Sequence, residues 1–411
     1  MEVVMKKRIT AVLLLLILTG GTGCGSRSLI RRREIDDLHL VQLVGIDKSE
    51  ENPGNQMITV ASKKLTDDTV QSNSQGDQNN TGGSGTVPGN KALIASAEGK
   101  TLFDACRNIQ THLDKTLFWS HTDYYLIGEE AARENIVKYI DFFARDHEFH
   151  IDGKVYIVKG STAKELIEKF NASEFYIVDK MDSLVRTAEF LGISEEMKLS
   201  ELMQFIDIHF GSARVPAIES VVRDQGEPVP DIESCGYAIV SDLKLADFIG
   251  RELSRGINLI TNTLGSSIVT VKDLHGENAS LEIIATNTEV IPHFVGDDLT
   301  EVTLKTEVES NLGEIQSQEK SIFEENLKHM EIQQSEILAN EMERALEVVQ
   351  ERGSDCLGIC DQIRLKHPVK WHGYEKQWID ILPQMKFKVE VESKLRRTYE
   401  LLEPSGYRGW K

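Results

Sequence analysis

The chain has 411 residues, of which 40% are hydrophobic and 27% charged, a composition typical of folded globular proteins. Its formal net charge of −20 at pH 7 argues against nucleic-acid binding and against electrostatic adhesion to anionic lipid, because both need clustered Lys and Arg. Five cysteines are too few for a disulfide scaffold at this length.

The N-terminus has the pattern of a secretory signal peptide. Basic residues at 6–8 precede an apolar run at 11–18, which is too short for a membrane-spanning helix of about 20 residues. Small residues at 21–23 then lead to Cys24. This arrangement is typical of bacterial lipoprotein signals, although Gly21 stands where such signals usually have Leu. We expect residues 1–23 to be cleaved off.

Cys24 is the predicted site of lipid attachment, through a diacylglycerol on its thiol and further fatty acylation. Two acyl chains hold a protein stably on a bilayer, so this lipid would supply the membrane attachment that an acidic surface does not. The alternative is an ordinary secreted protein with a chance cysteine at this position. Met5 is an alternative start, because Glu2 precedes the basic cluster.

Residues 24–185 are predicted to form an N-terminal α+β domain. The segments "VQLVGIDKS" and "MITVASKK" indicate a hairpin, and the polar run at 65–91 indicates a mobile loop. Strands and helices then alternate: "TLFDACRNIQTHLDK" has helical spacing, "DYYLIG" and "GKVYIVKG" are typical of strands, and Ser161 or Thr162 is a candidate helix cap.

Residues 186–290 are predicted to form a smaller middle α+β domain. A helix over "SELMQFIDIHF", with Ser200 as its candidate cap, is followed by a strand that turns at residues 241–242. The segment "RELSRGINLITN" indicates a further helix, and more strands follow it.

Residues 291–402 are predicted to form a C-terminal α+β domain, followed by a tail at 403–411. A long alternating strand precedes a helix over about 321–352, and Gly353 is its candidate C-cap. An apolar stripe along this helix favours packing on the domain's own sheet over a coiled coil. The segment "MKFKVEVESKLRRTYEL" alternates strictly, so the first and last strands of this domain can pair. The predicted fold class is therefore α+β, with three mixed domains, each a sheet flanked by helices.

The later cysteines and histidines offer a weak metal pattern. Cys356, Cys360, His367 and His372 have the spacing C-x3-C-x6-H-x4-H, but the spacer between the pairs is much shorter than in zinc fingers. Two buried thiols are favoured over a disulfide or a metal site. Cys106 and Cys235 are interpreted as small core residues, and we expect no metal and no cofactor beyond the lipid on Cys24.

Candidate catalytic groups are sparse. The nearest to an acid-base pair are His121 with Asp123, and Asp146 with His147, which we interpret as ordinary surface or strand-end residues. Carboxylate pairs such as those at 67–68 and 324–325 fall in a loop or on a solvated helix face. No G-x-S-x-G, H-E-x-x-H or Walker A pattern occurs. We therefore expect no enzyme and no catalytic residues.

Four segments in order resemble the Ger(x)C lipoproteins, the C subunits of bacterial spore germinant receptors. They are "RREIDDLHLVQLVGID", "EGKTLFDACRNIQTHLDKTLFWSHTDYYLIGEEAARENIVKYIDFFARD", "GYAIVSDLKLADFIGRELSRGINLI" and "RALEVVQERGSDCLGICDQIRLKHPVKWHGYEKQWIDILPQMKFKVEVESKLRR". The resemblance covers nearly the whole mature chain. The chain departs from the family at Gly21, in the polar run after Leu65, and at Cys356 and Cys360, where the family usually has apolar and aromatic residues.

The resemblance implies three α+β domains and a non-enzymatic receptor subunit, required for nutrients to trigger spore germination. It implies a location on the outer face of the spore inner membrane, beside two integral-membrane subunits, A and B. Lipidation carries over to Cys24 alone, and the family offers no catalytic residues. The alternatives left open are a substrate-binding lipoprotein of a transporter and a secreted cell-wall hydrolase. The germinant, and any direct contact with it, cannot be identified from the sequence.

Overall fold

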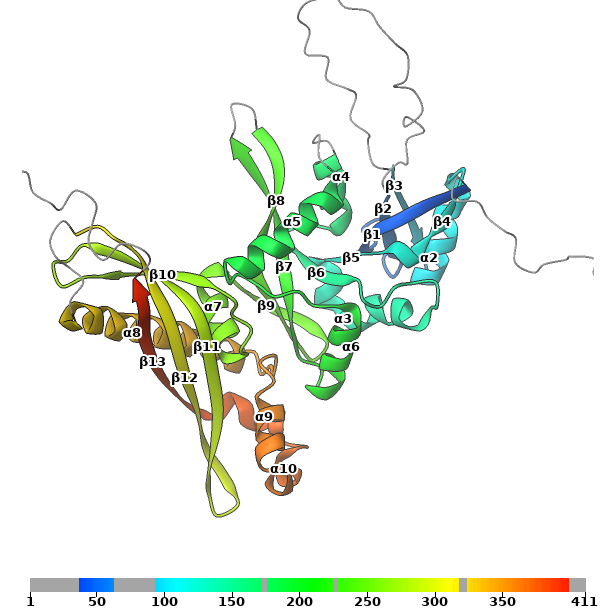
Figure 1. The fold of residues 1–411 in the computed structure, drawn as a ribbon. Helices are drawn as coiled ribbons and strands as arrows, with labels where there is room; N and C mark the ends of the chain where they lie inside the picture. The colour runs from blue at the N-terminus through cyan, green and yellow to red at the C-terminus, as the bar shows by residue number, and fades with distance from the viewer. Residues whose placement is uncertain (1–36, 63–92, 172–175, 225–227, 318–323, 399–411) are drawn as a thin grey trace, which may run out of the picture. The chain divides into compact units, whose positions relative to one another are not determined.

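The computed structural model describes residues 37–62, 93–171, 176–224, 228–317 and 324–398 (Figure 1). Strands of the first sheet are β1 (Leu38–Lys48), β2 (Gln56–Ser62), β3 (Leu93–Gly99), β4 (Thr116–Phe118), β5 (Tyr124–Gly128), β6 (Lys154–Lys159), β7 (Ala213–Asp224), β8 (Pro228–Ser241) and β9 (Lys244–Ile249). Strands of the second are β10 (Ser267–Lys272), β11 (Asn278–Val295), β12 (Asp298–Ile315) and β13 (Lys386–Thr398).

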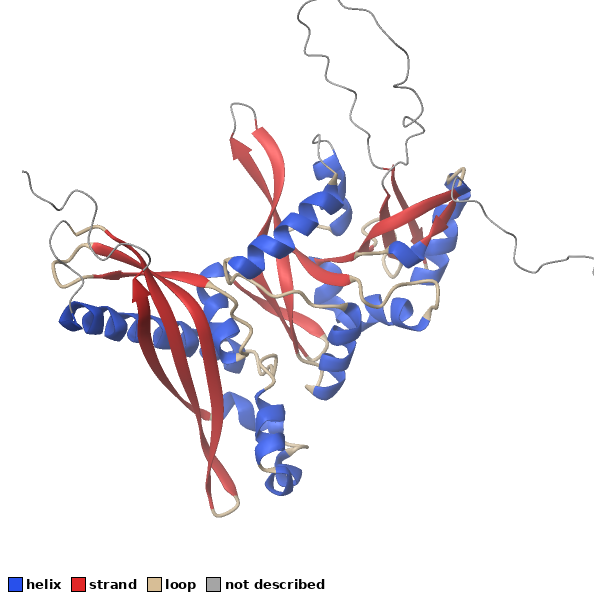
Figure 2. Cartoon of the chain, viewed as in Figure 1, coloured by secondary structure: helices blue, strands red, loops and turns tan. Residues whose placement is uncertain are grey.

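The helices cover these sheets, as the colouring by secondary structure shows (Figure 2). Those of the first half are α2 (Leu102–Ile109), α3 (Glu129–Arg145), α4 (Ala163–Asn171), α5 (Ile177–Phe190) and α6 (Leu199–Ile208), with 3-10 turns η2 (Gln110–His112) and η3 (Trp119–His121). Those of the second half are α7 (Arg251–Ile260), α8 (Glu324–Glu351), α9 (Ile359–Lys366), α10 (Pro368–Tyr374) and α11 (Trp378–Ile381), with η4 (Leu382–Gln384).

The first sheet is mixed, in the order β3-β2-β1-β5-β6-β7-β8-β9, with β4 paired to β1. Its middle strands β1, β5, β6 and β7 run parallel, whereas β2–β3 and β8–β9 add antiparallel hairpins at its two ends. Parallel neighbours need crossover connections, which α3 supplies between β5 and β6 and helices α4 to α6 supply between β6 and β7. The hairpin predicted for the first two strands is confirmed.

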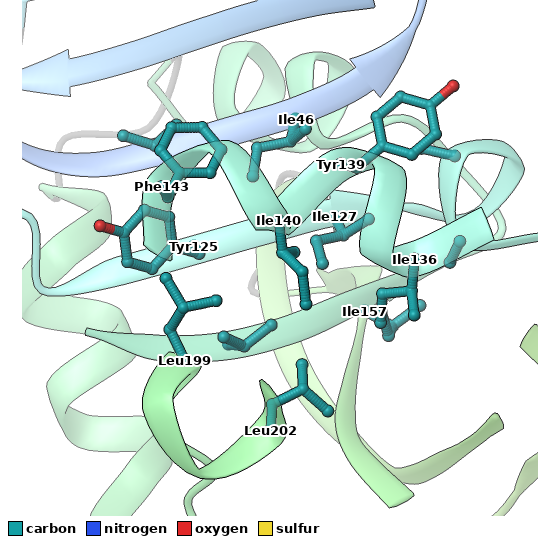
Figure 3. Close-up of a cluster of buried hydrophobic side chains, with 14 of the residues drawn as sticks. Ile46, Tyr125, Ile127, Ile136, Tyr139, Ile140, Phe143, Ile157, Leu199 and Leu202 are labelled. Carbon is teal, nitrogen blue, oxygen red and sulfur yellow. The ribbon is translucent and has the colours of Figure 1, made fainter. Parts of the chain in front are cut away.

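Helices cover both faces of this sheet, so its middle strands are buried on both sides. Along β5 the side chains alternate: Tyr125 and Ile127 pack with α2, α3 and α6, whereas Tyr124 and Leu126 pack with α4 and α5. Figure 3 shows four side chains of α3 against the strands, together with two from α6: Ile136, Tyr139, Ile140, Phe143, Leu199 and Leu202. A strand buried on both faces reads as a continuous apolar run, as "YYLIG" does.

A single carboxylate connects β1 to the start of α4. Asp47 at the end of β1 is buried, and its two oxygens accept hydrogen bonds from the backbone N–H groups of Ala163 at 2.8 Å and Lys164 at 2.9 Å. Thr162 Oγ1 accepts a third, from Glu165, which confirms Thr162 as the cap. These groups satisfy N–H donors that a helix N-terminus otherwise leaves without partners.

The second sheet is covered on one face by α8, which lies across its strands (Figure 1). The strand order is β10-β11-β12-β13, and β12 pairs with β13 in parallel, which confirms the predicted pairing of the first and last strands. The apolar stripe on α8 packs in this core through Met330, Leu338, Met342, Ala345, Leu346 and Val349. Packing of the stripe on the domain's own sheet is thus confirmed. Gly353 has φ 57° just after the helix, as a C-cap requires.

The α+β class is confirmed, but the strands of the middle segment do not make a sheet of their own. Pairing of β6 with β7 joins residues 154–159 to 213–224, so β7, β8 and β9 extend the first sheet. The three domain boundaries therefore stay a prediction. Within the described ranges, no helix is long and apolar enough to cross a membrane.

The proposed Ser200 cap is wrong. Helix α6 begins one residue earlier, at Leu199, and the carboxylate of Glu201 accepts from the backbone N–H of Lys198. The N–H groups of Leu199 and Ser200 bond to the backbone carbonyls of Gly153 and Ile151, in the distant turn between α3 and β6. The N–H of Leu202, which a Ser200 cap would have served, bonds to the Lys198 carbonyl within the helix.

Candidate functional site

The predicted lipidation site, Cys24, lies outside the described residues. So do the signal peptide at 1–23, the polar run at 65–91, the tail at 403–411 and the basic residues that precede the first strand. The lipid on Cys24 therefore stays a prediction.

The two histidine–aspartate pairs lie at the surface. His121 and Asp123 are both exposed at the end of η3, and the side chain of His147 is 95% exposed. Its Nδ1 lies 3.7 Å from Asp146 Oδ1, too far for a hydrogen bond. Neither pair lies in a cavity with a shielded partner, the arrangement that general acid-base catalysis uses.

The four cysteines in the described ranges are buried free thiols, so Cys356 and Cys360 form no disulfide, as expected. The two histidines of the C-x3-C-x6-H-x4-H pattern do not join the cysteines in a common site. The ring of His367 packs against Phe294, with ring centroids 5.1 Å apart, and the side chain of His372 is 85% exposed. Among described residues, Cys360 instead lies beside two groups from elsewhere, His209 and Asp355.

This buried polar cluster forms where α6 ends and β7 begins, against the segment that joins α8 to α9. Arg214 on β7 is buried, donates to the carbonyl of Cys356 at 3.0 Å and pairs with Glu195. Its guanidinium also lies 5.6 Å from the centroid of the Phe205 ring. The arginine therefore connects the first sheet to the segment that follows α8.

His209 is held in one orientation by two contacts with Phe205. The imidazole stacks on the phenyl ring at a centroid distance of 3.7 Å, and Nδ1 lies 2.8 Å from the Phe205 carbonyl oxygen. A carbonyl oxygen only accepts hydrogen bonds, so Nδ1 carries the hydrogen. The other ring nitrogen, Nε2, is buried without a hydrogen-bond partner and lies 3.2 Å from Asp361 Oδ2.

Asp355 organises the start of α9. Its two carboxylate oxygens accept from the backbone N–H groups of Ile359 at 3.0 Å and Cys360 at 3.2 Å, and its own N–H donates to Ser212 Oγ at 3.1 Å. Burial raises the pKa of Asp355 to about 6. Burial likewise raises the pKa of the Cys360 thiol, and the neighbouring Asp355 carboxylate adds to that rise.

A cavity of about 380 Å³ opens beside this cluster. His209, Arg214 and Gly358 form part of its wall, together with polar groups that include Asn262, just after α7, and Thr288 on β11. The cavity is large enough for a small polar molecule or several waters, and it leads from solvent to His209.

Reasoning from the sequence considered one member of this cluster, Cys360, together with His367 and His372, and did not favour that pattern as a metal site. His209 lies near the end of a predicted helix, with nothing to distinguish it from a surface histidine. Asp355 gave no capping signal either, because it stands four residues before Ile359, whereas a capping side chain is expected directly before the helix, where Gly358 lies.

Two family models match the chain in order. One, described as "Spore germination protein N-terminal domain", matches residues 31–220, and the other, described as "Spore germination B3/ GerAC like, C-terminal", matches residues 235–399. The chain is 21% identical over 413 residues to "Spore germination protein KC" of Bacillus subtilis (strain 168). This alignment covers 96% of each sequence. It is 20% identical over 307 residues to "Spore germination protein B3" of the same organism, across 73% of this chain and 79% of the relative.

A solved structure resembles most of the chain. It is described as the crystal structure of the GerBC protein, and it matches with a TM-score of 0.55 at 16% identity, over 86% of this chain and 96% of that one. At this identity the likeness shows that the two chains share a fold.

Proposed function

This chain belongs to the Ger(x)C family of spore germination proteins, and we propose that it is the C subunit of a nutrient germinant receptor. In that role the chain is required for a nutrient to trigger germination and catalyses no reaction itself. The observation that carries the proposal is the match of both family models, in order, from residue 31 to residue 399.

The proposal includes attachment to the outer face of the spore inner membrane through a lipid on Cys24. Its support is the signal-peptide pattern: a basic cluster, a short apolar run, and small residues directly before the cysteine. A diacylglycerol on the thiol places two acyl chains in the bilayer, and two chains give stable attachment where one gives only marginal binding.

The proposed partners are the integral-membrane A and B subunits of the receptor. Anchored beside them, the chain contacts them through its folded surface and stabilises their signalling state. Lipid attachment favours such contacts because it confines the chain to the plane in which its partners lie. Loss of the anchor lowers the local concentration of the chain without changing its binding surface.

Two other functions receive no support from the fold. A substrate-binding protein of a transporter needs two similar lobes around a cleft, whereas the two sheets here differ in strand number and strand order. A cell-wall hydrolase needs a shielded pair of carboxyl groups with separated environments. The carboxylates of Glu324 and Glu325 are exposed at the start of α8, and the pair at 67–68 lies outside the described residues.

The test is a germination assay on spores that carry Cys24→Ala, with fractionation of membranes from the same spores. We expect the variant to leave the membrane fraction and the nutrient response to collapse. Ser26→Ala, a change of similar size two residues away, keeps the cysteine and is the matched control. It should behave as the unmodified chain does.

The two parts of the proposal fail separately. If Cys24→Ala stays on the membrane and germination is normal, the lipid anchor is wrong. If spores without the whole chain, and without its relatives, still respond fully to every nutrient tested, the receptor role is wrong as well.

A further inference from the structure

Three buried side chains place metal-binding atoms close together in the described structure. They are His209 from the end of α6, and Asp355 and Cys360 from the segment around the start of α9. One nitrogen, one carboxylate oxygen and one sulfur lie within 4.8 Å of one another. His209 lies 146 residues before Asp355 in the sequence. Only the fold brings them together.

The histidine is oriented as metal-binding histidines are. Its Nδ1–H is committed to the Phe205 carbonyl at 2.8 Å, so in a neutral ring Nε2 carries the lone pair that can bind a metal. A backbone carbonyl on one ring nitrogen is a recurrent outer contact of histidines that bind metal through the other. The side chain is only 3% exposed, so water does not readily reach Nε2, yet Nε2 has no hydrogen-bond partner.

The other two donors are also held in place. Backbone N–H groups of Ile359 and Cys360 fix the carboxylate of Asp355, and each carboxylate oxygen keeps a further lone pair. The thiol of Cys360 hydrogen-bonds this carboxylate, so its sulfur lies directly beside Asp355. Binding therefore needs little ordering of side chains.

The cluster is rich in acceptors and has no cation at its centre. His209 Nε2 lies 3.2 Å from a carboxylate oxygen of Asp361, and a ring nitrogen of His209 lies within 4.8 Å of an Asp355 oxygen. Two nearby arginines are directed elsewhere: Arg214 binds Glu195 and the Cys356 carbonyl, and Arg364 binds Asp361 Oδ1 at 2.7 Å. Asp361 has Arg364 as its positive partner, whereas Asp355 forms no ion pair with a described residue, so a cation beside Asp355 is favoured.

We propose that His209 Nε2, an Asp355 carboxylate oxygen and Cys360 Sγ bind a divalent transition-metal ion, with Zn²⁺ as the preferred one. Nitrogen, sulfur and oxygen together suit zinc, whereas Ca²⁺ and Mg²⁺ require oxygen ligands alone. The Cys360 thiol loses its proton to solvent as the sulfur–zinc bond forms. The thiolate and the carboxylate then balance the two positive charges of the ion.

The surroundings allow an ion to reach the site. Tetrahedral zinc holds N, O and S ligands about 3.5 Å apart, whereas the three donor atoms here lie within 4.8 Å of one another, so they need to close in by up to about 1.3 Å. The cavity beside the cluster has His209 in its wall and supplies a path from solvent. Gly358 also lines it, and an added Cβ there would lie 3.2 Å from His209 Nε2, so glycine keeps that approach open.

The metal would tie the end of α6 to the start of α9. Its role is structural: three protein ligands come from two parts of the chain that the fold brings together, and binding stabilises the folded state by mass action. This inference does not depend on the receptor function, because it concerns the folding of this chain alone.

The test uses the full chain, purified in detergent and stripped with a chelator, then titrated with Zn²⁺ and with Co²⁺. We expect one ion per chain, a higher melting temperature with Zn²⁺, and with Co²⁺ a thiolate-to-metal charge-transfer absorption band. Cys360→Ser should abolish the charge-transfer band and weaken metal binding at least about 100-fold. His209→Gln should weaken binding to a similar degree.

The matched control is Cys356→Ser, which removes the other buried thiol four positions away. This variant should keep the metal and the absorption band, and its folding shows whether loss of a thiol alone disturbs the segment. No metal bound to the unmodified chain at saturating Zn²⁺ would overturn the proposal. Equal binding by Cys360→Ser and by the unmodified chain would overturn it too.

Discussion

Individual buried polar residues decide how segments distant in sequence meet in this protein. Both carboxylate oxygens of Asp47 accept hydrogen bonds from backbone N–H groups in the first turn of α4. The backbone of Gly128 passes so close to this carboxylate that a Cβ there would lie 2.0 Å from Asp47 Oδ1. Only glycine fits there. Asp47 at the end of the first strand is thus explained by the hydrogen bonds of one helix terminus and by close packing against Gly128.

Asp47 also makes the stability of the protein depend on pH. Burial raises its pKa from 3.8 to about 6, which outweighs the two N–H groups that lower it. A pKa raised in the folded state means that the folded protein holds this proton more tightly than the unfolded chain does. The resulting stabilisation is complete below pH 3.8 and disappears as the pH rises through about 6.

We expect the free energy of unfolding of the unmodified chain to fall between pH 4 and pH 6, with Asp47 contributing about 2–3 kcal/mol of that fall. The side chain in Asp47→Asn cannot ionise, so the unfolding free energy of this variant should fall by about 2–3 kcal/mol less between pH 4 and pH 6 than that of the unmodified chain. Urea denaturation at several pH values measures both slopes. Asp355 is unchanged in the variant, so its own contribution cancels in the comparison, and identical slopes would contradict the assignment.

Ion pairs hold neighbouring helices and strands together, and their contribution to stability depends on how deeply they are buried. Between α7 and α8, Arg255 binds both oxygens of Glu341 at 2.7 and 2.5 Å, with side chains only 18% and 15% exposed. The same guanidinium donates to the carbonyl of Ile268 on β10 at 2.8 Å. One arginine therefore holds together two helices and the edge of the second sheet.

Arg255→Lys should lower the unfolding free energy by about 1–2 kcal/mol, because an ammonium keeps the charge but loses the two-pronged geometry. Arg352→Lys is the control: Arg352 pairs with Asp247 with side chains 44% and 38% exposed, and its replacement should cost less than about 0.5 kcal/mol. Denaturant titration of both variants measures the difference. Equal losses would show that burial of the pair does not matter.

At the scale of the whole molecule, the apolar cores are not confined to single sheets. Tyr237, Ile239 and Ile249 from β8 and β9 belong to the same buried cluster as Met342 and Leu346 of α8. The hydroxyl of Ser354, just after α8, donates to the Val240 carbonyl at 2.7 Å. Residues of the first sheet thus contribute to the core of the second.

We expect the described part of the chain to unfold in one transition for this reason, with calorimetric and van't Hoff enthalpies equal. Ser354→Ala removes the hydroxyl that donates to Val240 and should move the whole transition down by about 1–3 °C without splitting it. Scanning calorimetry of the full chain in detergent is the measurement. Two separate peaks in the unmodified protein would show that the sheets unfold independently.

The pattern of the sequence predicted most elements, because periodicity directly reports which side chains face a core. The run of Tyr124 to Gly128, the stripe on α8 and the alternation in β13 all appear where expected. Cap positions were less predictable. Thr162 was correct because its hydroxyl bonds locally, and Ser200 was wrong because the N–H groups near it bond to a distant turn.

The sequence by itself determined the α+β class, the buried faces and the free thiols, since each follows from the local order of apolar and polar residues. Tertiary structure alone decided that β7 pairs with β6, so that strands of the middle segment extend the first sheet. It also decided that Cys360 lies beside His209 and Asp355 and not beside the later histidines. Periodicity records which face of an element is buried, whereas the identity of the neighbour depends on how distant elements pack.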